Sequence, residues 1–251
     1  MRKIFIPLVA FLLLNVTLFT SCKKNDEDLS GMAQGNLFFP LQVGKYILYD
    51  VDSIYWNDSL KAEIHRRCQM RYDVVDSFYN DDDQVSYVIN VLSRPTDADT
   101  FLPNDVIYVT PTSHNVIVTQ HNLKFIKMIF PVANGTSWDG NALIPLSDSD
   151  YVQFASDKWA YTYTQFDEPY YPGNTVYEHT VTVNEIDDQI SDPDMDSTVY
   201  ASRNFSKEVY AYNVGLVYRE RIYWTFEPAV PDGGSGYRHG YGVIMKAVDN
   251  N

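Results

Sequence analysis

Cysteine is scarce in this chain of 251 residues, which contains only Cys22 and Cys68. Two cysteines allow at most one disulfide, so a network of cross-links cannot hold the fold together. Cys68 alternates with Met70 and Tyr72 on the predicted inward side of a strand, where a thiol behaves as a small, unreactive apolar group. The stability of the folded part must therefore come from a hydrophobic core.

Positive charge is also scarce. The sequence has 19 Lys and Arg against 33 Asp and Glu, which gives a formal net charge of -14. A chain this acidic repels phosphate groups, so it is a poor partner for nucleic acids and anionic lipid headgroups, and we expect no nucleic-acid partner. Any attachment to a membrane must depend on something other than surface charge.

Motifs for catalysis and metal binding are missing from the sequence. The five histidines form no HExxH motif and no close pair. His179 shares a strand face with Val181 and Val183, which favours a hydrogen-bonded core histidine over a metal ligand. Ser235 lies in a Gly-rich loop, but Tyr237 occupies a position where the nucleophile motif GxSxG requires glycine. We therefore expect no enzyme and no cofactor; the alternative is a hydrolase whose paired carboxylates only a structure would reveal.

The N-terminal apolar run, residues 4–14, is too short for a membrane-spanning helix, which needs about 20 apolar residues. Two basic residues precede it and small or polar residues follow it up to Cys22, which is the order of a secretory signal. The segment resembles the lipobox of bacterial lipoproteins, with Phe19 as a departure from the usual pattern. The resemblance implies a signal peptide over residues 1–21 and a diglyceride and palmitate on Cys22. The alternative is an ordinary secretory signal.

Residues 22–36 combine charge, glycine and small polar side chains with little apolar content. Such a segment cannot bury enough surface to fold, so we expect a flexible tether. Lipoproteins of the Bacteroidota type carry a similar acidic cluster after the cysteine. This resemblance implies an outer-membrane location, lipid-anchored and facing the cell exterior.

Alternation of apolar and polar residues dominates the remaining chain. Residues 159–164 place Trp, Tyr and Tyr at every second position, which is the period of a strand with one covered face. The same pattern occurs over residues 64–74, 85–91 and 177–183. Further strands are expected over residues 45–55, 106–110, 115–120, 123–130, 215–226 and 240–248. Turn-forming residues separate them. We predict an all-β fold over residues 37–251, a single antiparallel domain that is a barrel, a half-barrel or a sandwich. Residues 203–212 form at most a short helical turn and fit a strand equally well.

Three segments resemble a widespread group of Bacteroidota-type outer-membrane lipoproteins. They are FFPLQVGKY at 38–46, WDGN at 138–141 and VYAYNVGLVY at 209–218. The resemblance implies an antiparallel β fold and an envelope location, and it implies no activity. In physical terms, Phe39 and Leu41 are expected to plug one end of the core. The Asp-Gly pair in WDGN is expected to form a turn with positive φ, with its tryptophan packed beneath.

Aromatic residues are the most suggestive surplus, with 20 Tyr, 13 Phe and 4 Trp. Most of them are explained by strand propensity. Rings beside polar neighbours in predicted loops are candidates for ligand binding, because amphipathic rings provide large contact area at low entropic cost. The candidates are Trp56, Tyr170, Tyr171 and Tyr237.

The acidic segment around Asp192, Asp194 and Asp196 matches the opening of a calcium-binding loop. However, Ser197 stands where such a loop needs glycine and Arg203 where it needs a bidentate glutamate. A solvated acidic loop is the preferred interpretation, and a calcium site is the alternative.

Three functional hypotheses follow. The first is a non-enzymatic cell-surface lipoprotein that binds an unknown glycan or protein. The second is a lipocalin-like carrier of an apolar small molecule in a β-barrel cavity, and the third is the hydrolase named above. A cavity map separates them, since a carrier needs an apolar cavity of several hundred Å³.

Overall fold

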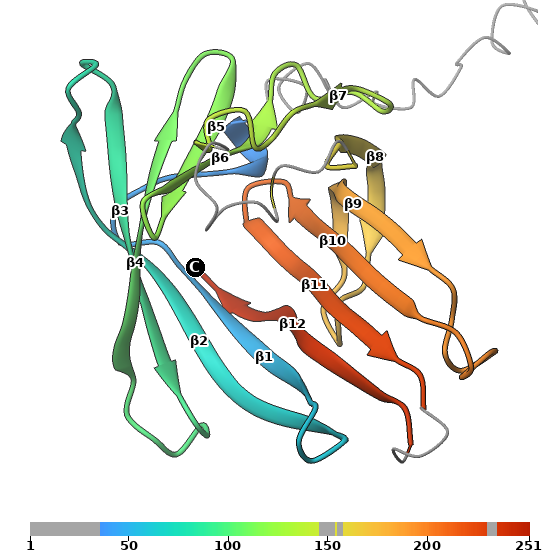
Figure 1. Cartoon of the computed structure of the whole chain (residues 1–251). Coiled ribbons are helices and arrows are strands. Elements are labelled where there is room, and N and C mark those ends of the chain that lie inside the picture. The colour runs from blue at the N-terminus through green and yellow to red at the C-terminus, as the bar shows by residue number, and fades with distance from the viewer. Residues whose placement is uncertain (1–35, 146–153, 155–157, 230–234) are drawn as a thin grey trace, which may run out of the picture. The chain divides into compact units, whose positions relative to one another are not determined.

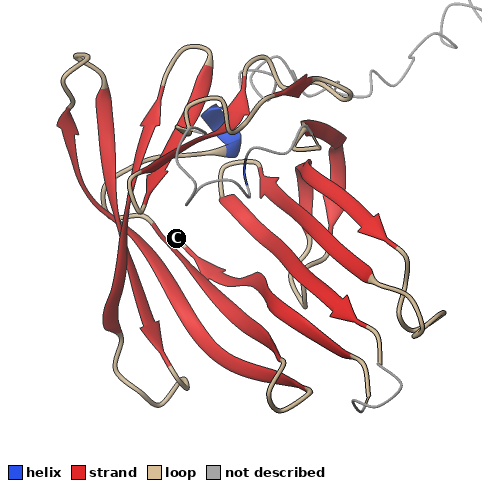
Figure 2. Cartoon of the chain, viewed as in Figure 1, coloured by secondary structure: helices blue, strands red, loops and turns tan. Residues whose placement is uncertain are grey.

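The computed structural model describes residues 36–145, 154, 158–229 and 235–251. The predicted signal peptide, the lipidation site Cys22 and nearly all of the predicted tether lie outside these residues. The described body consists almost wholly of strands and connecting loops (Figure 2). Its helical structure is one 3-10 turn, η1 (Asn36–Phe38). Within the described residues, no helix has the length and apolar character needed to cross a membrane.

Twelve strands form one sheet (Figure 1). They are β1 (Tyr46–Asn57), β2 (Ala62–Tyr79), β3 (Val85–Arg94), β4 (Leu102–Pro111), β5 (Asn115–Gln120), β6 (Leu123–Ile129), β7 (Ser137–Trp138), β8 (Tyr161–Tyr170), β9 (Tyr177–Ile190), β10 (Ala201–Ala211), β11 (Gly215–Glu227) and β12 (Tyr237–Asn250). The predicted all-β fold is confirmed, and residues 203–212 lie mainly in β10 rather than in a helix.

The strand order is β6-β5-β4-β3-β2-β1-β12-β11-β10-β9-β8-β7, with every neighbouring pair antiparallel. The first and last strands pair in the middle of the sheet, while β6 and β7 end it on either side. The sheet curls until these ends meet. The amide of Ile126 donates to the carbonyl of Gly140 at 2.8 Å, and the Tyr163 hydroxyl bonds both backbone groups of Ile129 at 2.9 Å. The result is a nearly closed barrel made of one sheet, so the sandwich alternative is excluded.

The predicted alternation in residues 159–164 is confirmed by burial. Trp159, Tyr161 and Tyr163 are 8%, 1% and 0% exposed and belong to the main hydrophobic cluster. That cluster also takes residues from β2 to β6 and from β9 to β11. The core therefore fills the barrel interior from both halves of the sheet.

The segment before β1 closes one end of this core, as predicted. Phe38 is fully buried, and its ring lies 6.0 Å from Phe166 and 6.1 Å from Tyr212. Phe39 packs on Tyr210 with ring centres 5.6 Å apart. Leu41 also packs against the main cluster. Phe38, Phe39 and Leu41 therefore form a plug at this end of the core, directly before the first strand.

The tryptophan of the WDGN segment packs as expected, but its glycine is needed for a different reason than the one predicted. The Trp138 indole lies 4.6 Å from the ring of Tyr163 and donates to the carbonyl of Ile126 at 2.8 Å. The expected positive φ at the Asp-Gly pair is wrong, because neither residue has one. Instead, a Cβ atom at Gly140 would lie 2.4 Å from the ring of Tyr161. Glycine is needed there for close approach.

Candidate functional site

The inner face of the sheet is identified by contacts that cross the barrel. Lys127 of β6 and Glu208 of β10 are far apart in the strand order, yet Nζ lies 3.0 Å from the carboxylate. Arg219 of β11 donates from Nε to the same carboxylate at 2.7 Å, so it also points inwards. Side chains two positions apart on a strand share a face. Because β11 pairs with β12 without a register shift, Arg221 and Tyr223 point inwards too.

Three tyrosines form a row across this inner face, which we call the tyrosine ladder. Tyr55 of β1 pairs with Tyr241 of β12, and Tyr241 pairs with Tyr223 of β11. Their exposed fractions are 44%, 44% and 37% in the same order. The rings of Tyr223 and Tyr241 lie 5.8 Å apart. Half-exposed amphipathic rings on a curved sheet provide a surface on which a ligand can stack.

Two arginines lie against the ladder. The guanidinium of Arg66 is 5.5 Å from the ring centre of Tyr55. The guanidinium of Arg221 is 5.6 Å and 5.8 Å from the other two ladder rings, and 5.4 Å from the ring of Trp159. These are cation–π distances. The ladder therefore combines apolar ring faces with positive charge, in a chain that is acidic overall.

A cavity of about 240 Å³ adjoins the ladder at Arg221. Its walls mix apolar, aromatic and charged side chains: Ile107, Val118, Gln120, Phe125, Lys127, Phe154, Trp159, Tyr161, Glu185, Ser206, Glu208, Arg219 and Arg221. Pockets for drug-sized ligands measure about 300–1,000 Å³. This mixed-wall cavity therefore suits a smaller polar group, such as one sugar ring.

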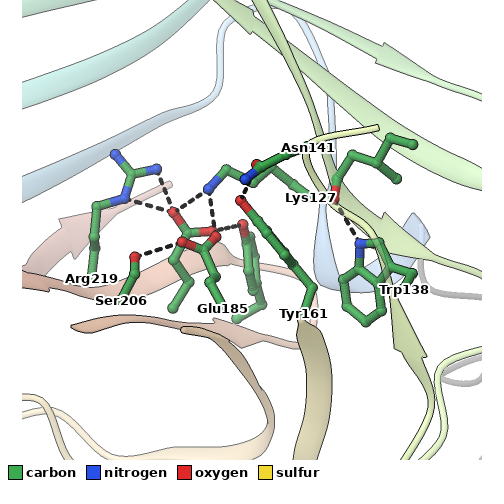
Figure 3. A network of polar contacts seen from close by, with 10 residues as sticks. Lys127, Trp138, Asn141, Tyr161, Glu185, Ser206 and Arg219 are labelled. Atoms are coloured by element: carbon green, nitrogen blue, oxygen red, sulfur yellow. Dashed lines mark hydrogen bonds and ion pairs between the residues drawn. The ribbon is translucent and has the colours of Figure 1, made fainter. Parts of the chain in front are cut away.

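Four of the charged residues of the cavity, Lys127, Glu185, Glu208 and Arg219, form one network (Figure 3). Lys127 reaches both carboxylates, at 2.6 Å from Glu185 and 3.0 Å from Glu208. Glu208 also accepts hydrogen bonds from Arg219 Nε at 2.7 Å and from the Tyr210 hydroxyl at 2.5 Å, and Arg219 Nη2 forms an ion pair with it at 2.7 Å. Both carboxylates are almost fully buried. The network links β6 to β9, β10 and β11 across the interior.

The two carboxyl groups have pKa values that are moved apart. Burial raises the pKa of Glu185, and the negative charge of Glu208 adds to the rise. Burial acts in the same direction on Glu208. There, Arg219, Lys127 and the Tyr210 hydroxyl outweigh burial and hold the pKa of Glu208 at about 2. Glu208 stays ionised at neutral pH, and Glu185 is the first of the pair to take up a proton as the pH falls.

Two carboxyl groups with separated pKa values in one cavity are typical of an acid and a nucleophile in glycoside hydrolysis. Here the ammonium of Lys127 lies between them, bonded to both. A scissile glycosidic oxygen would need that space. The two carboxylates are therefore bridged by a cation rather than separated by open space.

A second cavity on the other side of Lys127 and Arg219 is apolar and small, at about 80 Å³. It lies between the Phe39–Leu41 plug and the strands of the inner face. Carriers of apolar ligands need several hundred Å³. This cavity is therefore too small for such a ligand and does not support the carrier hypothesis.

The four predicted ligand-binding rings are not brought together. Trp56 lies on the outer face, where its indole donates to Glu63 at 2.8 Å and packs on the cluster of Ala201, Trp224 and Phe226. Tyr170 packs on Tyr218, which also faces outwards, and Tyr171 beside it is 64% exposed. Tyr237 falls on the inner face by register, beyond the ladder, with the Lys61 ammonium 5.6 Å from its ring.

The predicted acidic loop makes local bonds. Asp192 accepts from the amide of Asp194 at 2.9 Å, and Asp196 accepts from both donors of Thr198. These bonds lower the pKa of Asp196. Asp194 pairs with Arg238 at 2.9 Å. Among the residues that the structure describes, no group of three acidic, histidine or cysteine side chains could hold a metal ion.

For His179 and Cys68, the sequence predicts structural roles. His179 was expected in the core, but its side chain is 37% exposed and its Nδ1 lies 2.6 Å from Asp167. It is hydrogen-bonded, as predicted, at the edge of the core. Cys68 packs as a partly buried residue against the second apolar cluster, and burial raises the pKa of its thiol. That environment fits the predicted inert role.

The ladder and the charged network were missed by sequence analysis. A usable signal was present for part of them. Glu185 continues the inward alternation of Val181 and Val183, and Arg219 precedes Arg221 and Tyr223 at the same period. Charges at core positions of a strand mark a buried polar site. The partner Lys127 could not be found this way, because its contacts come from the far side of the barrel.

Comparison with known proteins gives little further information. The sequence matches no known family model and no curated protein. Among solved structures, the chain is similar to a predicted exported protein with a YmcC-like fold from Bacteroides fragilis. That match covers 85% of this chain and 99% of the other, with 11% identity and a TM-score of 0.36. Similarity at this level does not identify a function.

Proposed function

We propose that this chain is a non-enzymatic, lipid-anchored binding protein of the outer membrane that binds a saccharide on its inner face. The observation that carries this proposal is the tyrosine ladder beside the mixed-wall cavity. The C–H face of a sugar ring packs on an aromatic face, while its hydroxyl groups bond to polar and charged side chains. The ladder and the cavity offer both kinds of contact side by side.

The dimensions support an oligosaccharide rather than a single sugar. The ladder lies in a register row that runs from Ile64 through the three tyrosines to Asn204. This row crosses five neighbouring strands, which corresponds to about 20 Å at the usual strand spacing. Such a row is long enough for several linked sugar rings, one of which can enter the cavity at Arg221.

A glycan array tests saccharide binding, using the full chain kept in a mild detergent. We expect the wild-type chain to bind at least one saccharide class and Tyr241→Ala to weaken that binding by about tenfold, because a ring face is lost. The matched control is Tyr79→Ala, which removes a 74%-exposed ring outside the ladder and should leave binding unchanged. Equal weakening by both variants, or no binding to any saccharide, would contradict the proposal.

The proposed anchor is tested separately. Cys22→Ser removes the thiol that a lipid would modify, so the variant should leave the membrane fraction and lose the mass of its acyl groups. Protease treatment of intact cells should release the wild-type domain if it faces the exterior. A Cys22→Ser chain that stays membrane-bound, with no acyl mass in either form, would contradict the anchor while leaving saccharide binding untouched.

A protein ligand is the second candidate, favoured by an exposed apolar patch on the outer face. Phe78 of β2 and Tyr108 of β4 are 43% and 42% exposed, and their rings meet edge to face at 6.0 Å. Val106, two positions from Tyr108, is 41% exposed. Exposed apolar patches often mark protein interfaces. If Phe78→Ser abolishes capture of a cell-surface protein and Tyr241→Ala does not, this candidate replaces the first.

A further inference from the structure

Arg221 has an unusual environment for a half-buried cation. Its Nη1 donates to the Asn204 side chain at 2.6 Å and to the carbonyls of Phe205 and Ile222 at 3.0 Å and 3.1 Å. All three acceptors are neutral. Within the described residues, no carboxylate lies at ion-pair distance from Arg221, and its Nε and Nη2 groups have no acceptor.

The unused donors of Arg221 form a geometric pair. Nε–H and Nη2–H lie on one edge of the planar guanidinium and point in parallel, which is the edge that binds a carboxylate through two hydrogen bonds. The guanidinium is held by the three acceptors of Nη1, and the ring centres of Trp159, Tyr223 and Tyr241 lie 5.4, 5.6 and 5.8 Å from its carbon. A fixed, partly desolvated fork costs little entropy when an anion binds.

The balance of charges in the cavity also indicates that the positive charge of Arg221 is available to a ligand. Three cations line it, namely Lys127, Arg219 and Arg221, against the two carboxylates of Glu185 and Glu208. Lys127 and Arg219 are already paired with those carboxylates. The unmatched positive charge is therefore that of Arg221, at the point where the cavity meets the ladder.

We propose that the ligand is an acidic saccharide whose carboxylate binds the Nε and Nη2 edge of Arg221, while a neighbouring sugar ring stacks on Tyr223 and Tyr241. This inference rests on the proposed saccharide-binding function and narrows it to glycans that contain uronic acids. Arg66, 5.5 Å from the ring of Tyr55 and without an ion pair in the described part of the chain, provides a second positive charge for the next acidic unit.

Matched pairs of saccharides test the inference on the wild-type full chain. The probes are galacturonate- and glucuronate-containing oligosaccharides and their carboxyl-reduced forms, which keep the rings but lose the charge. We expect the acidic form to bind at least about tenfold more tightly, because a charge-assisted hydrogen-bond pair is lost on reduction. Equal binding of both forms overturns the acidic-ligand inference and leaves the proposed saccharide binding intact. Failure of both forms while other glycans bind also overturns it, and failure of every saccharide removes the proposed function as well.

Variants locate the charge contact. Arg221→Gln should weaken binding of the acidic probe by about tenfold to a hundredfold and weaken binding of the reduced probe by a much smaller factor, because the reduced probe loses only the packing of Arg221. Arg67→Gln is the matched control, since it removes one positive charge from a side chain that is 81% exposed on the outer face. Equal effects of the two variants would overturn the assignment to Arg221. If Arg221→Gln does not fold, Arg221→Lys keeps the charge but loses the fork, and it should still weaken the acidic probe selectively.

Discussion

Replacing Lys127 by methionine is expected to lower the free energy of unfolding at pH 7 by about 3–5 kcal/mol, the usual cost of leaving a buried charge without its partner. The ammonium of Lys127 is 2.6 Å from Glu185 and 3.0 Å from Glu208. After the substitution Glu208 keeps Arg219 and Tyr210, whereas Glu185 keeps only the hydrogen bond from Ser206 at 2.6 Å. The loss should therefore come mainly from Glu185.

The pH dependence of this loss identifies its cause. Burial already raises the pKa of Glu185 above its ordinary value of 4.5. Without the ammonium, the pKa of Glu185 in the folded chain rises further, so the folded state binds a proton that the unfolded state releases. Stability of the variant then falls as the pH rises above 4.5. The deficit relative to the wild type should be largest near neutral pH and should shrink as the pH approaches 4.5.

Urea denaturation followed by circular dichroism measures the deficit at several pH values. The double variant Lys127→Met/Glu185→Gln is the control, because a neutral glutamine no longer needs the ammonium. We expect it to recover most of the lost stability. A loss of stability below about 1 kcal/mol that does not change with pH would refute the reasoning. It would mean that the charged network contributes little to holding the strands of the barrel together.

Three further predictions concern stability and closure of the barrel. The pKa of Glu208 is about 2 in the folded chain against an ordinary 4.5, so its contribution to stability is complete above pH 4.5 and is lost towards pH 2. Unfolding measured between pH 4.5 and pH 2 should therefore show a loss of about 3 kcal/mol in the wild type. Glu208→Gln should not show this loss. Gly140→Ala should lower the free energy of unfolding by about 1–3 kcal/mol, measured by heat or urea, because the new Cβ meets the Tyr161 ring. The control Gly173→Ala has open space around it and should leave stability nearly unchanged. Equal losses in the two variants would argue against the close approach at Gly140. Trp138→Phe removes the bond to the Ile126 carbonyl, so hydrogen exchange of amides in β6 and β7 should accelerate while those in β1 and β12 stay unchanged.

The strands could be predicted from the sequence because each has one buried face. Alternation such as Trp159, Tyr161 and Tyr163 repeats with period two wherever a sheet covers a core. The choice between barrel and sandwich could not be predicted, because it depends on where the two ends of the sheet meet. In this chain they meet through the Ile126 amide and the Tyr163 hydroxyl, and neither contact leaves a local pattern.

The sequence predicts that the candidate site is an aromatic surface, but not which residues form it. The surplus of tyrosine indicated a ring surface, but the residues chosen were mostly elsewhere. Trp56 and Tyr55 are adjacent in the sequence and lie on opposite faces of β1, so a shift of one position separates a packed outer ring from a ladder ring. Which parity faces inwards follows from cross-barrel pairs such as Lys127 with Glu208. Lys127 and Glu208 are 81 residues apart in the sequence, so no local pattern reveals their contact.

Hydroxyl-radical footprinting of the full chain, read by mass spectrometry with and without the bound saccharide, tests most directly whether the inner face is the binding surface. We predict that oxidation of Tyr55, Tyr223 and Tyr241 falls when the saccharide binds, whereas oxidation of Tyr79 and Tyr171 is unchanged. Protection of Tyr79 or Tyr171 with the three ladder rings still fully reactive would contradict saccharide binding on the inner face.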